Sequence, residues 1–195
     1  MRIISGIFKG KTINFLKSST TRPLKDSVKE NIFNIIAHSN EFNINIKKSN
    51  ILDLYSGIGS FGLECISRGA SKVTFVEKDK EVVKILSDNL LRLDASDKAN
   101  IIVDEIKKFL EKKQLLKYEI IFLDPPFREN TYIEELEIIK KMKVYNTNHI
   151  VIIHRESKQL DDFKKILTPL VIKQYGRSKI IFGKFLILNS FSIFF

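Results

Sequence analysis

From residue 50 onward, short continuous apolar runs alternate with longer segments in which apolar residues recur every three or four positions. The first pattern is typical of strands buried on both faces, and the second is typical of amphipathic helices. Strands are predicted at residues 51–55, 73–77, 99–104, 119–124 and 150–154. Helices are predicted at residues 59–68, 80–93, 106–116, 132–142 and 160–167. This alternation predicts an α/β fold in which a parallel sheet carries helices on both faces.

The two ends of the chain break this alternation. Residues 2–16 hold two apolar runs around a glycine-containing turn region, which predicts a β-hairpin. Apolar residues at helical spacing then predict a helix over residues 28–36. At the other end, predicted strands at 170–175 and 180–188 flank a short turn. Because so short a connection can only join antiparallel neighbours, we expect these last two strands to pair antiparallel.

The composition sets limits on the class of protein. A length of 195 residues suits one domain with a small appendage, which we expect as a hairpin extension over residues 1–20 and a main domain over residues 21–195. Cys65 is the only cysteine, so an internal disulfide is impossible and a reducing, cytoplasmic compartment is expected. The residues after Met1 lack the apolar stretch of a secretion signal, and no apolar run reaches membrane-spanning length.

The positive charge is concentrated at the start of the chain. The net charge is +10, and residues 1–30 hold seven cations and two anions, which is half of that excess. A basic cluster is the electrostatic signature of a phosphate-bearing partner, so this segment predicts nucleic-acid binding. The candidate RNA contacts are Arg2, Lys9, Lys11 and Arg22. A lysine-rich composition without a phosphate partner is the alternative explanation.

A glycine-rich loop follows the first predicted strand. The candidate cofactor-binding residues in and around it are Asp53, Tyr55, Ser56, Gly57, Gly59, Gly62, Glu77 and Asp104. Glycines let the backbone turn sharply and approach a ligand, and the helix behind them offers free N–H groups. Glu77 ends the next strand, where a carboxylate can accept hydrogen bonds from ribose hydroxyls.

The spacing of Gly57, Gly59 and Gly62 also fits a dinucleotide site, which makes a dehydrogenase the competing enzyme class. The carboxylate of Asp53 argues against it, because it would repel a pyrophosphate. An acidic residue suits a cationic ligand, and S-adenosylmethionine carries a sulfonium and an ammonium group but no phosphate. We therefore predict S-adenosylmethionine as the cofactor. Asp104 is expected either to accept the adenine amine or to cap the following helix, and a turn that needs glycines only for its geometry is the remaining alternative.

The fourth predicted strand ends in the motif Asp124-Pro125-Pro126-Phe127, which forms the candidate catalytic site. The prolines make this segment rigid. An exocyclic amine on a base is a poor nucleophile, because its lone pair is conjugated into the ring. Two acceptors, the Asp124 carboxylate and the Pro125 carbonyl, would favour the pyramidal nitrogen that can attack, while Phe127 stacks on the base. The alternative is a strand stopped by a Pro-Pro turn with a solvated Asp124.

Three histidines, His38, His149 and His154, lack metal-ligand spacing. We therefore expect no metal site, and core or surface roles for all three.

Three blocks of the chain together resemble the RsmD family of bacterial small-subunit ribosomal RNA guanine-N2 methyltransferases, over nearly the whole length. The blocks are Arg2-Ile3-Ile4-Ser5-Gly6 with Lys9-Gly10-Lys11, Leu52-Asp53-Leu54-Tyr55-Ser56-Gly57 with Gly59 and Gly62, and Asp124-Pro125-Pro126-Phe127. The resemblance implies a Rossmann-like class I methyltransferase fold with a seven-stranded, mostly parallel sheet and an antiparallel last strand, preceded by a β-hairpin and a helix. Leu24 departs from the family, which commonly has Thr there, and the apolar tail after Ile187 has no counterpart.

The sequence therefore predicts a methyltransferase that transfers a methyl group from S-adenosylmethionine to the exocyclic N2 amine of a guanine in 16S ribosomal RNA. We expect it to act as a monomer on RNA within small-subunit particles, without a metal or a membrane. An adenine-N6 methyltransferase on DNA or RNA is the rival within the same chemistry. An RNA-binding ribosome-assembly factor is the rival from another class.

Overall fold

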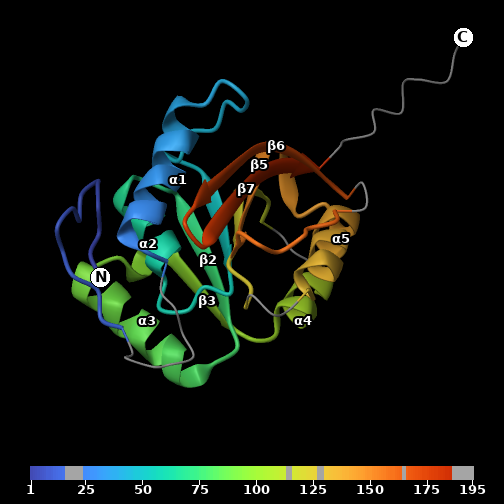
Figure 1. Ribbon diagram of the computed structural model, residues 1–195. Helices are drawn as coiled ribbons and strands as arrows, with labels where there is room; N and C mark the ends of the chain where they lie inside the picture. Colours follow the sequence, from blue (N-terminus) through green and yellow to red (C-terminus); the bar gives the residue numbers. More distant parts are fainter. Residues whose placement is uncertain (16–23, 113–115, 127–129, 164–165, 186–195) are drawn as a thin grey trace, which may run out of the picture.

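The computed structural model describes residues 1–15, 24–112, 116–126, 130–163 and 166–185. Seven strands form one sheet in the order β3-β2-β1-β4-β5-β7-β6 (Figure 1). They are β1 (Asn50–Leu54), β2 (Lys72–Glu77), β3 (Ala99–Val103), β4 (Tyr118–Leu123), β5 (Tyr145–Glu156), β6 (Leu167–Tyr175) and β7 (Ser178–Phe185). The first five strands are mutually parallel, and β7 lies antiparallel between β5 and β6. The predicted seven-stranded sheet with an antiparallel last strand is confirmed.

Helices cover both faces of this sheet. They are α1 (Asp26–His38), α2 (Ser60–Ser67), α3 (Lys80–Leu93), α4 (Ile106–Glu111) and α5 (Tyr132–Met142). Apolar residues of α1, α2 and α3 belong to one buried cluster, and those of α4 and α5 belong to a second. Ile120 and Ile121 of β4 contribute to opposite clusters, so the central strands are buried on both sides. This explains why the strands read as continuous apolar runs.

Two loops meet at the edge where the parallel strands end. Strand β1 pairs with β2 on one side and with β4 on the other, and Leu54 of β1 is level with Leu123 of β4. Sequence order therefore reverses at β1, which is where ligands bind in open α/β sheets. The loop after β1 and the loop after β4 consequently start side by side.

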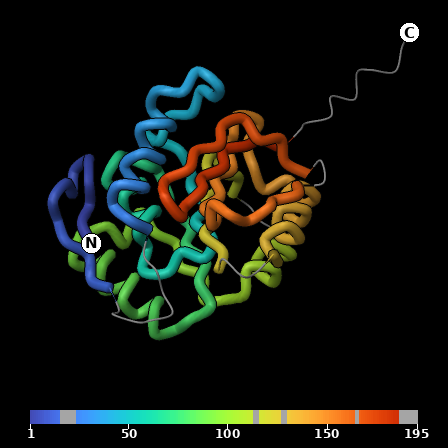
Figure 2. The backbone as a smooth tube through the Cα atoms, viewed as in Figure 1, coloured from blue at the N-terminus to red at the C-terminus, as the bar shows by residue number. Residues whose placement is uncertain are grey.

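The N-terminal segment forms the predicted hairpin in a short form, with an antiparallel bridge between Arg2 and Thr12 and backbone hydrogen bonds that join its two arms. Further hydrogen bonds fix this hairpin to α2. The backbone N–H groups of Ile4 and Ser5 donate to the carboxylate of Glu64 on α2. The segment runs along the side of the sheet that α1, α2 and α3 cover (Figure 2). Its apolar side chains Ile3, Phe8 and Ile13 are buried in the same cluster as the apolar residues of these helices. The expected domain boundary at residue 20 lies outside the described residues.

The helix predicted over residues 160–167 is wrong for the described part of that segment, where no residue is helical and Leu167 already belongs to β6. Leu160 is 97% exposed, so it does not anchor a helix on the core. The carboxylate of Asp161 instead forms ion pairs with Arg155 and Lys179. These tertiary contacts override the local apolar spacing.

Helix α4 also ends at Glu111, five residues earlier than predicted, and residues 113–115 lie outside the description. No helix in the described ranges has the length and apolar character needed to cross a membrane.

Candidate functional site

The glycine loop (residues 55–62) joins β1 to α2 and needs its glycines for different reasons. Gly57 and Gly59 have φ angles of +53° and +86°, a region that favours glycine. A Cβ on Gly62 would lie 2.3 Å from the ring of Phe75 on β2, so this glycine lets α2 pack closely on the sheet. A Cβ on Gly57 would meet nothing within 4 Å, which leaves its face of the loop open to a ligand.

The backbone donors of this loop are held by the protein's own carboxylates. The N–H of Gly57 donates to Oε2 of Glu77 at 3.0 Å, and the N–H of Gly62 donates to Oδ2 of Asp53 at 2.9 Å. The N–H groups that we expected to be free for a ligand are therefore already bonded at two positions. Because these N–H groups are bonded to carboxylates, the loop is a poor site for a pyrophosphate. This contact pattern argues against a dinucleotide separately from the charge of Asp53.

Asp53 lies deeper than expected. Its side chain is buried, and burial raises the pKa of its carboxyl group well above the usual range. Its described partner is the N–H of Gly62, and it does not line the neighbouring pocket. Asp53 thus holds the glycine loop and α2 together, and a direct contact with the cofactor stays a prediction.

A pocket of about 220 Å³ opens at the ends of β1, β2 and β3, beside α5. Three predicted cofactor residues, Tyr55, Glu77 and Asp104, line it. Five carboxylate residues and two lysines contribute to its wall, so the lining is acidic. The acidic side chains are Glu77, Asp104, Glu105, Glu134 and Glu135. Such a lining suits a cationic ligand.

The lining side chains keep acceptor capacity. The oxygens of Glu77 accept from the N–H groups of Gly57 and Asp79, and each oxygen has a second lone-pair direction available. Tyr55 donates its hydroxyl to Glu135 at 2.8 Å. Ser56 follows Tyr55 in the chain without lining the pocket itself, and its Oγ is buried without a hydrogen-bond partner in the described part of the chain.

Asp104 faces this pocket rather than capping α4. The residue before α4 is Glu105, and no side chain caps that helix. The Nζ of Lys112 lies 2.7 Å from Oδ2 of Asp104, and this hydrogen bond lowers the pKa of Asp104. Asp104 is therefore an ionised acceptor at neutral pH.

The Asp-Pro-Pro segment (residues 124–126) leaves β4 next to the glycine loop, with the N–H of Asp124 donating to the carbonyl of Leu54 at 3.4 Å. The side chain of Asp124 is 24% exposed. Pro125 is buried and Pro126 is exposed. Phe127, the fourth residue of the predicted catalytic motif, lies outside the described residues.

Sequence reasoning missed two residues at the end of β5 that hold this segment. Nδ1 of His154 lies 2.8 Å from Oδ1 of Asp124. Arg155 is fully buried, and its guanidinium donates to the carbonyl of Pro126 at 3.4 Å and to Oδ1 of Asn130 at 3.1 Å. A usable signal was present, because a His-Arg pair interrupts an apolar strand at the edge where the motif strand also ends.

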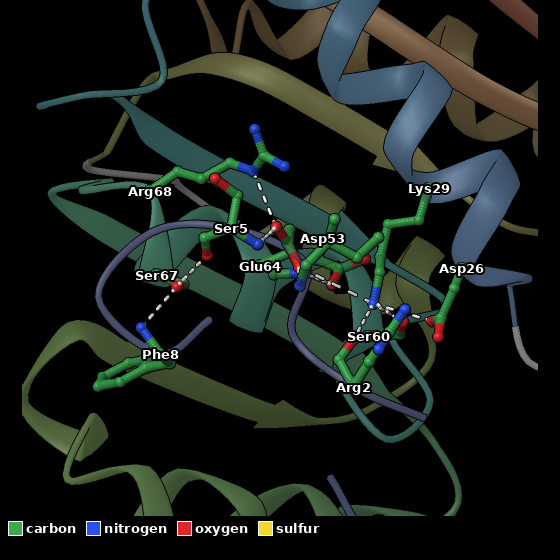
Figure 3. Close-up of polar contacts among 12 residues, drawn as sticks. Arg2, Ser5, Phe8, Asp26, Lys29, Asp53, Ser60, Glu64, Ser67 and Arg68 are labelled. Carbon is green, nitrogen blue, oxygen red and sulfur yellow. Dashed lines mark hydrogen bonds and ion pairs between the residues drawn. The ribbon is translucent and has the colours of Figure 1, made fainter. Parts of the chain in front are cut away.

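The predicted RNA contacts lie on the N-terminal segment, which is fixed to α1 and α2 (Figure 3). The side chains of Arg2, Lys9 and Lys11 are exposed, whereas Arg22 lies outside the described residues. Nζ of Lys29 is buried and donates to the carbonyl of Arg2 at 2.9 Å. Glu64 accepts from Ser5 and from Arg68, both at 2.9 Å.

Lys29 is one of the seven cations of the first thirty residues, but it cannot meet a phosphate from this buried position. The exposed basic surface is therefore smaller than the charge count suggested.

Comparisons with known proteins agree with this geometry. The model of the family described as conserved hypothetical protein 95 matches residues 1–184. Ribosomal RNA small subunit methyltransferase D of Haemophilus influenzae is 33% identical over 171 residues, which cover 87% of this chain and 83% of the relative. The protein of the same name from Buchnera aphidicola subsp. Baizongia pistaciae is 31% identical over 98% of this chain and 94% of its own. The solved structure of Escherichia coli yhhF has a TM-score of 0.80 at 26% identity and covers 94% of this chain and 96% of its own. The chain thus belongs to the conserved hypothetical protein 95 family.

Proposed function

We propose that this chain transfers a methyl group from S-adenosylmethionine to the exocyclic N2 amine of a guanine in small-subunit ribosomal RNA. The proposal is carried by one arrangement, in which the Asp124 carboxylate emerges beside the glycine loop and the pocket beyond that loop is acidic. The names of the Haemophilus and Buchnera relatives support ribosomal RNA of the small subunit as the substrate.

The acidic pocket fits the cofactor. Glu77 and Asp104 offer acceptors for ribose hydroxyls and for the adenine amine, between the apolar side chains of Val76 and Ile106. The unpartnered Oγ of Ser56 is a buried polar atom that a ligand can satisfy. When bound, S-adenosylmethionine supplies a methyl group on a positively charged sulfonium. The surplus of carboxylates in the lining would stabilise that charge.

The Asp-Pro-Pro segment acts on the target amine. The carboxylate of Asp124 and the carbonyl of Pro125 accept its two N–H groups, which pulls the nitrogen towards the pyramidal form. The nitrogen lone pair would then be free to attack the methyl group that the bound cofactor supplies, with the N–C bond forming as the S–C bond breaks. The nitrogen is positively charged after transfer and loses one proton to the carboxylate or to water. Because the leaving group is a cation, these steps need no strong base.

The basic N-terminal segment is proposed to bind the RNA. Arg2, Lys9 and Lys11 are exposed on it, and Arg22 and Phe127 stay predicted contacts for the backbone and the target base. We further propose that the protein acts as a monomer on small-subunit particles.

The test uses ribosomal RNA and small ribosomal subunits from cells that lack this gene, incubated with the protein and labelled S-adenosylmethionine. Mass spectrometry of the digested RNA is expected to show N2-methylguanosine. N6-methyladenosine as the product would refute the proposed base specificity. Loss of labelling in Asp124→Asn, with folding intact, is the control that assigns the activity to this site.

A further inference from the structure

The side chain of His154 links the start of β7 to the end of β4, and the proposed mechanism gives this contact no role. It lies near the end of β5, between β4 and β7. Its Nδ1 is 2.8 Å from Oδ1 of Asp124, and its Nε2 is 3.0 Å from Oγ of Ser178, the first residue of β7. The His154 side chain is only 7% exposed, and these contacts engage both of its ring nitrogens.

The chemistry of Asp124 sets the direction of these hydrogen bonds, since the Ser178 hydroxyl can either donate or accept. An ionised carboxylate offers only acceptors, so the ring nitrogen that faces Asp124 must carry the proton. In the neutral ring Nε2 is then an acceptor, and the Ser178 hydroxyl is its donor. The result is a series of two hydrogen bonds, in which Ser178 donates to His154 and His154 donates to Asp124.

These hydrogen bonds use one oxygen of the Asp124 carboxylate and leave the other oxygen for the substrate. Oδ2 of Asp124 has no protein partner in the described ranges. A carboxylate held at Oδ1 loses rotational freedom, so its second oxygen is presented to the amine in one orientation. Holding a catalytic group in its productive geometry lowers the barrier without any contact to the substrate.

The next residue holds the other end of the same segment. Neighbouring residues of a strand point to opposite faces, so His154 and Arg155 leave β5 on different sides. His154 bonds Asp124, while the buried guanidinium of Arg155 bonds the carbonyl of Pro126. The Pro125 carbonyl lies between these two attachment points.

We propose that His154 is a positioning residue for the methyl transfer, acting through its Nδ1–H on the Asp124 carboxylate, with the Ser178 hydroxyl donating to the opposite ring nitrogen. The inference rests on the proposed function of Asp124 as the group that grips the target amine. It adds to that site a series of hydrogen bonds through three residues, from β7 through β5 to the end of β4.

The first test compares two amide replacements of His154. The amide nitrogen of asparagine reaches the place of Nδ1, whereas that of glutamine reaches the place of Nε2. His154→Asn is therefore expected to keep the single-turnover methylation rate within about threefold of wild type. His154→Gln and His154→Ala are expected to lose roughly 10- to 100-fold, the range typical of groups that orient a functional residue. Ser178→Ala should lose less, and the affinity for S-adenosylmethionine should not change in any of the four.

The order of the two amides separates positioning from packing. Glutamine is closer to histidine in volume, so a purely structural role would favour His154→Gln over His154→Asn. That order, or wild-type rates in all four folded variants, would overturn the proposal.

A second measurement does not depend on methylation. Nitrogen NMR of the His154 ring is expected to show the Nδ1–H form in the wild type and a mixture of tautomers in Asp124→Ala. A wild-type ring protonated only at Nε2 would also overturn the proposal. If the wild type methylates a base other than guanine, the proposed function fails in its specificity, and the order of the variants is then measured on that base.

Discussion

The glycine loop and the Asp-Pro-Pro segment start side by side, at level residues of paired strands, yet they are held in opposite ways. Carboxylates hold the glycine loop, since Glu77 and Asp53 accept from its backbone N–H groups. Donors hold the Asp-Pro-Pro segment, since His154 bonds the carboxylate of Asp124 and Arg155 bonds the carbonyl of Pro126.

The difference shows how one sheet edge can serve two ligands of opposite need. Two backbone donors of the glycine loop are bonded to carboxylates, and the loop borders an acidic pocket, which suits a cation. The Asp-Pro-Pro segment keeps acceptors available, which suits the N–H groups of an amine. The atoms that hold each loop differ from those proposed to meet its ligand: backbone N–H groups hold the first, and Oδ1 of Asp124 with the carbonyl of Pro126 holds the second.

The largest expected effect tests the acceptor side of this comparison. Asp124→Ala should lower the single-turnover methylation rate by about a hundredfold or more, by analogy with removal of one group that stabilises a transition state. Its affinity for S-adenosylmethionine, measured by calorimetry on the same samples, should stay at the wild-type value. A variant that loses cofactor affinity instead would assign Asp124 to the pocket and remove the distinction between the two loops.

Glu77 tests the other side. Glu77→Ala should weaken S-adenosylmethionine binding by roughly 1–3 kcal/mol, because a charged acceptor is removed from the pocket and from the N–H of Gly57. Calorimetry measures this change, and Glu81→Ala, which removes an exposed carboxylate of α3, is the matched control. The methylation rate at saturating cofactor should fall much less than in Asp124→Ala. Wild-type affinity in Glu77→Ala would contradict the assignment.

The contribution of Asp53 to the unfolding free energy should depend on pH. Burial raises the pKa of Asp53 in the folded chain, so the folded state binds this proton more tightly than the unfolded state. The stability contribution is fully present below the unfolded pKa and is lost as pH rises through the folded pKa. The change Asp53→Asn keeps an acceptor for the N–H of Gly62 and removes the ionisation. The unfolding free energy of this variant, relative to wild type, should therefore increase with pH in urea titrations. A difference that does not vary with pH would mean that Asp53 ionises as freely as in the unfolded chain.

The smallest effect concerns the N-terminal segment. Replacing Lys9 and Lys11 by Gln should reduce the slope of log K against log salt for RNA binding by about 0.7 for each phosphate that these lysines neutralise. Lys98→Gln, a change just before β3, serves as the control. An unchanged slope in the folded double variant would show that this charge only reflects composition.

The sequence was sufficient where a signal was local. Strands β1, β2 and β4 were predictable because burial on both faces makes them continuous apolar runs. The glycine loop and the Asp-Pro-Pro segment were found because each motif is contiguous. His154 was not assigned a role, because it is 30 residues from Asp124 and the contact exists only once β4 and β5 are neighbours.

The failure over residues 160–167 has a physical cause. The predicted helix followed local apolar spacing. In the structure, the carboxylate of Asp161 instead forms ion pairs with Arg155 and Lys179 of the neighbouring strands. Ion pairs between separate elements leave no periodic trace in a single sequence.

The attachment of the N-terminal segment to α2 has a consequence for the order of folding. The N–H groups of Ile4 and Ser5 find their acceptor 60 and 59 residues later in the chain, on Glu64. Although this segment is synthesised before α2, it cannot bury Ile3 against that helix until α2 has formed, and contacts of such long sequence separation are slow to close. During synthesis, its basic side chains therefore reach their final positions only after the helix that begins at the glycine loop. The surface proposed to bind RNA is completed after the loop proposed to border the cofactor.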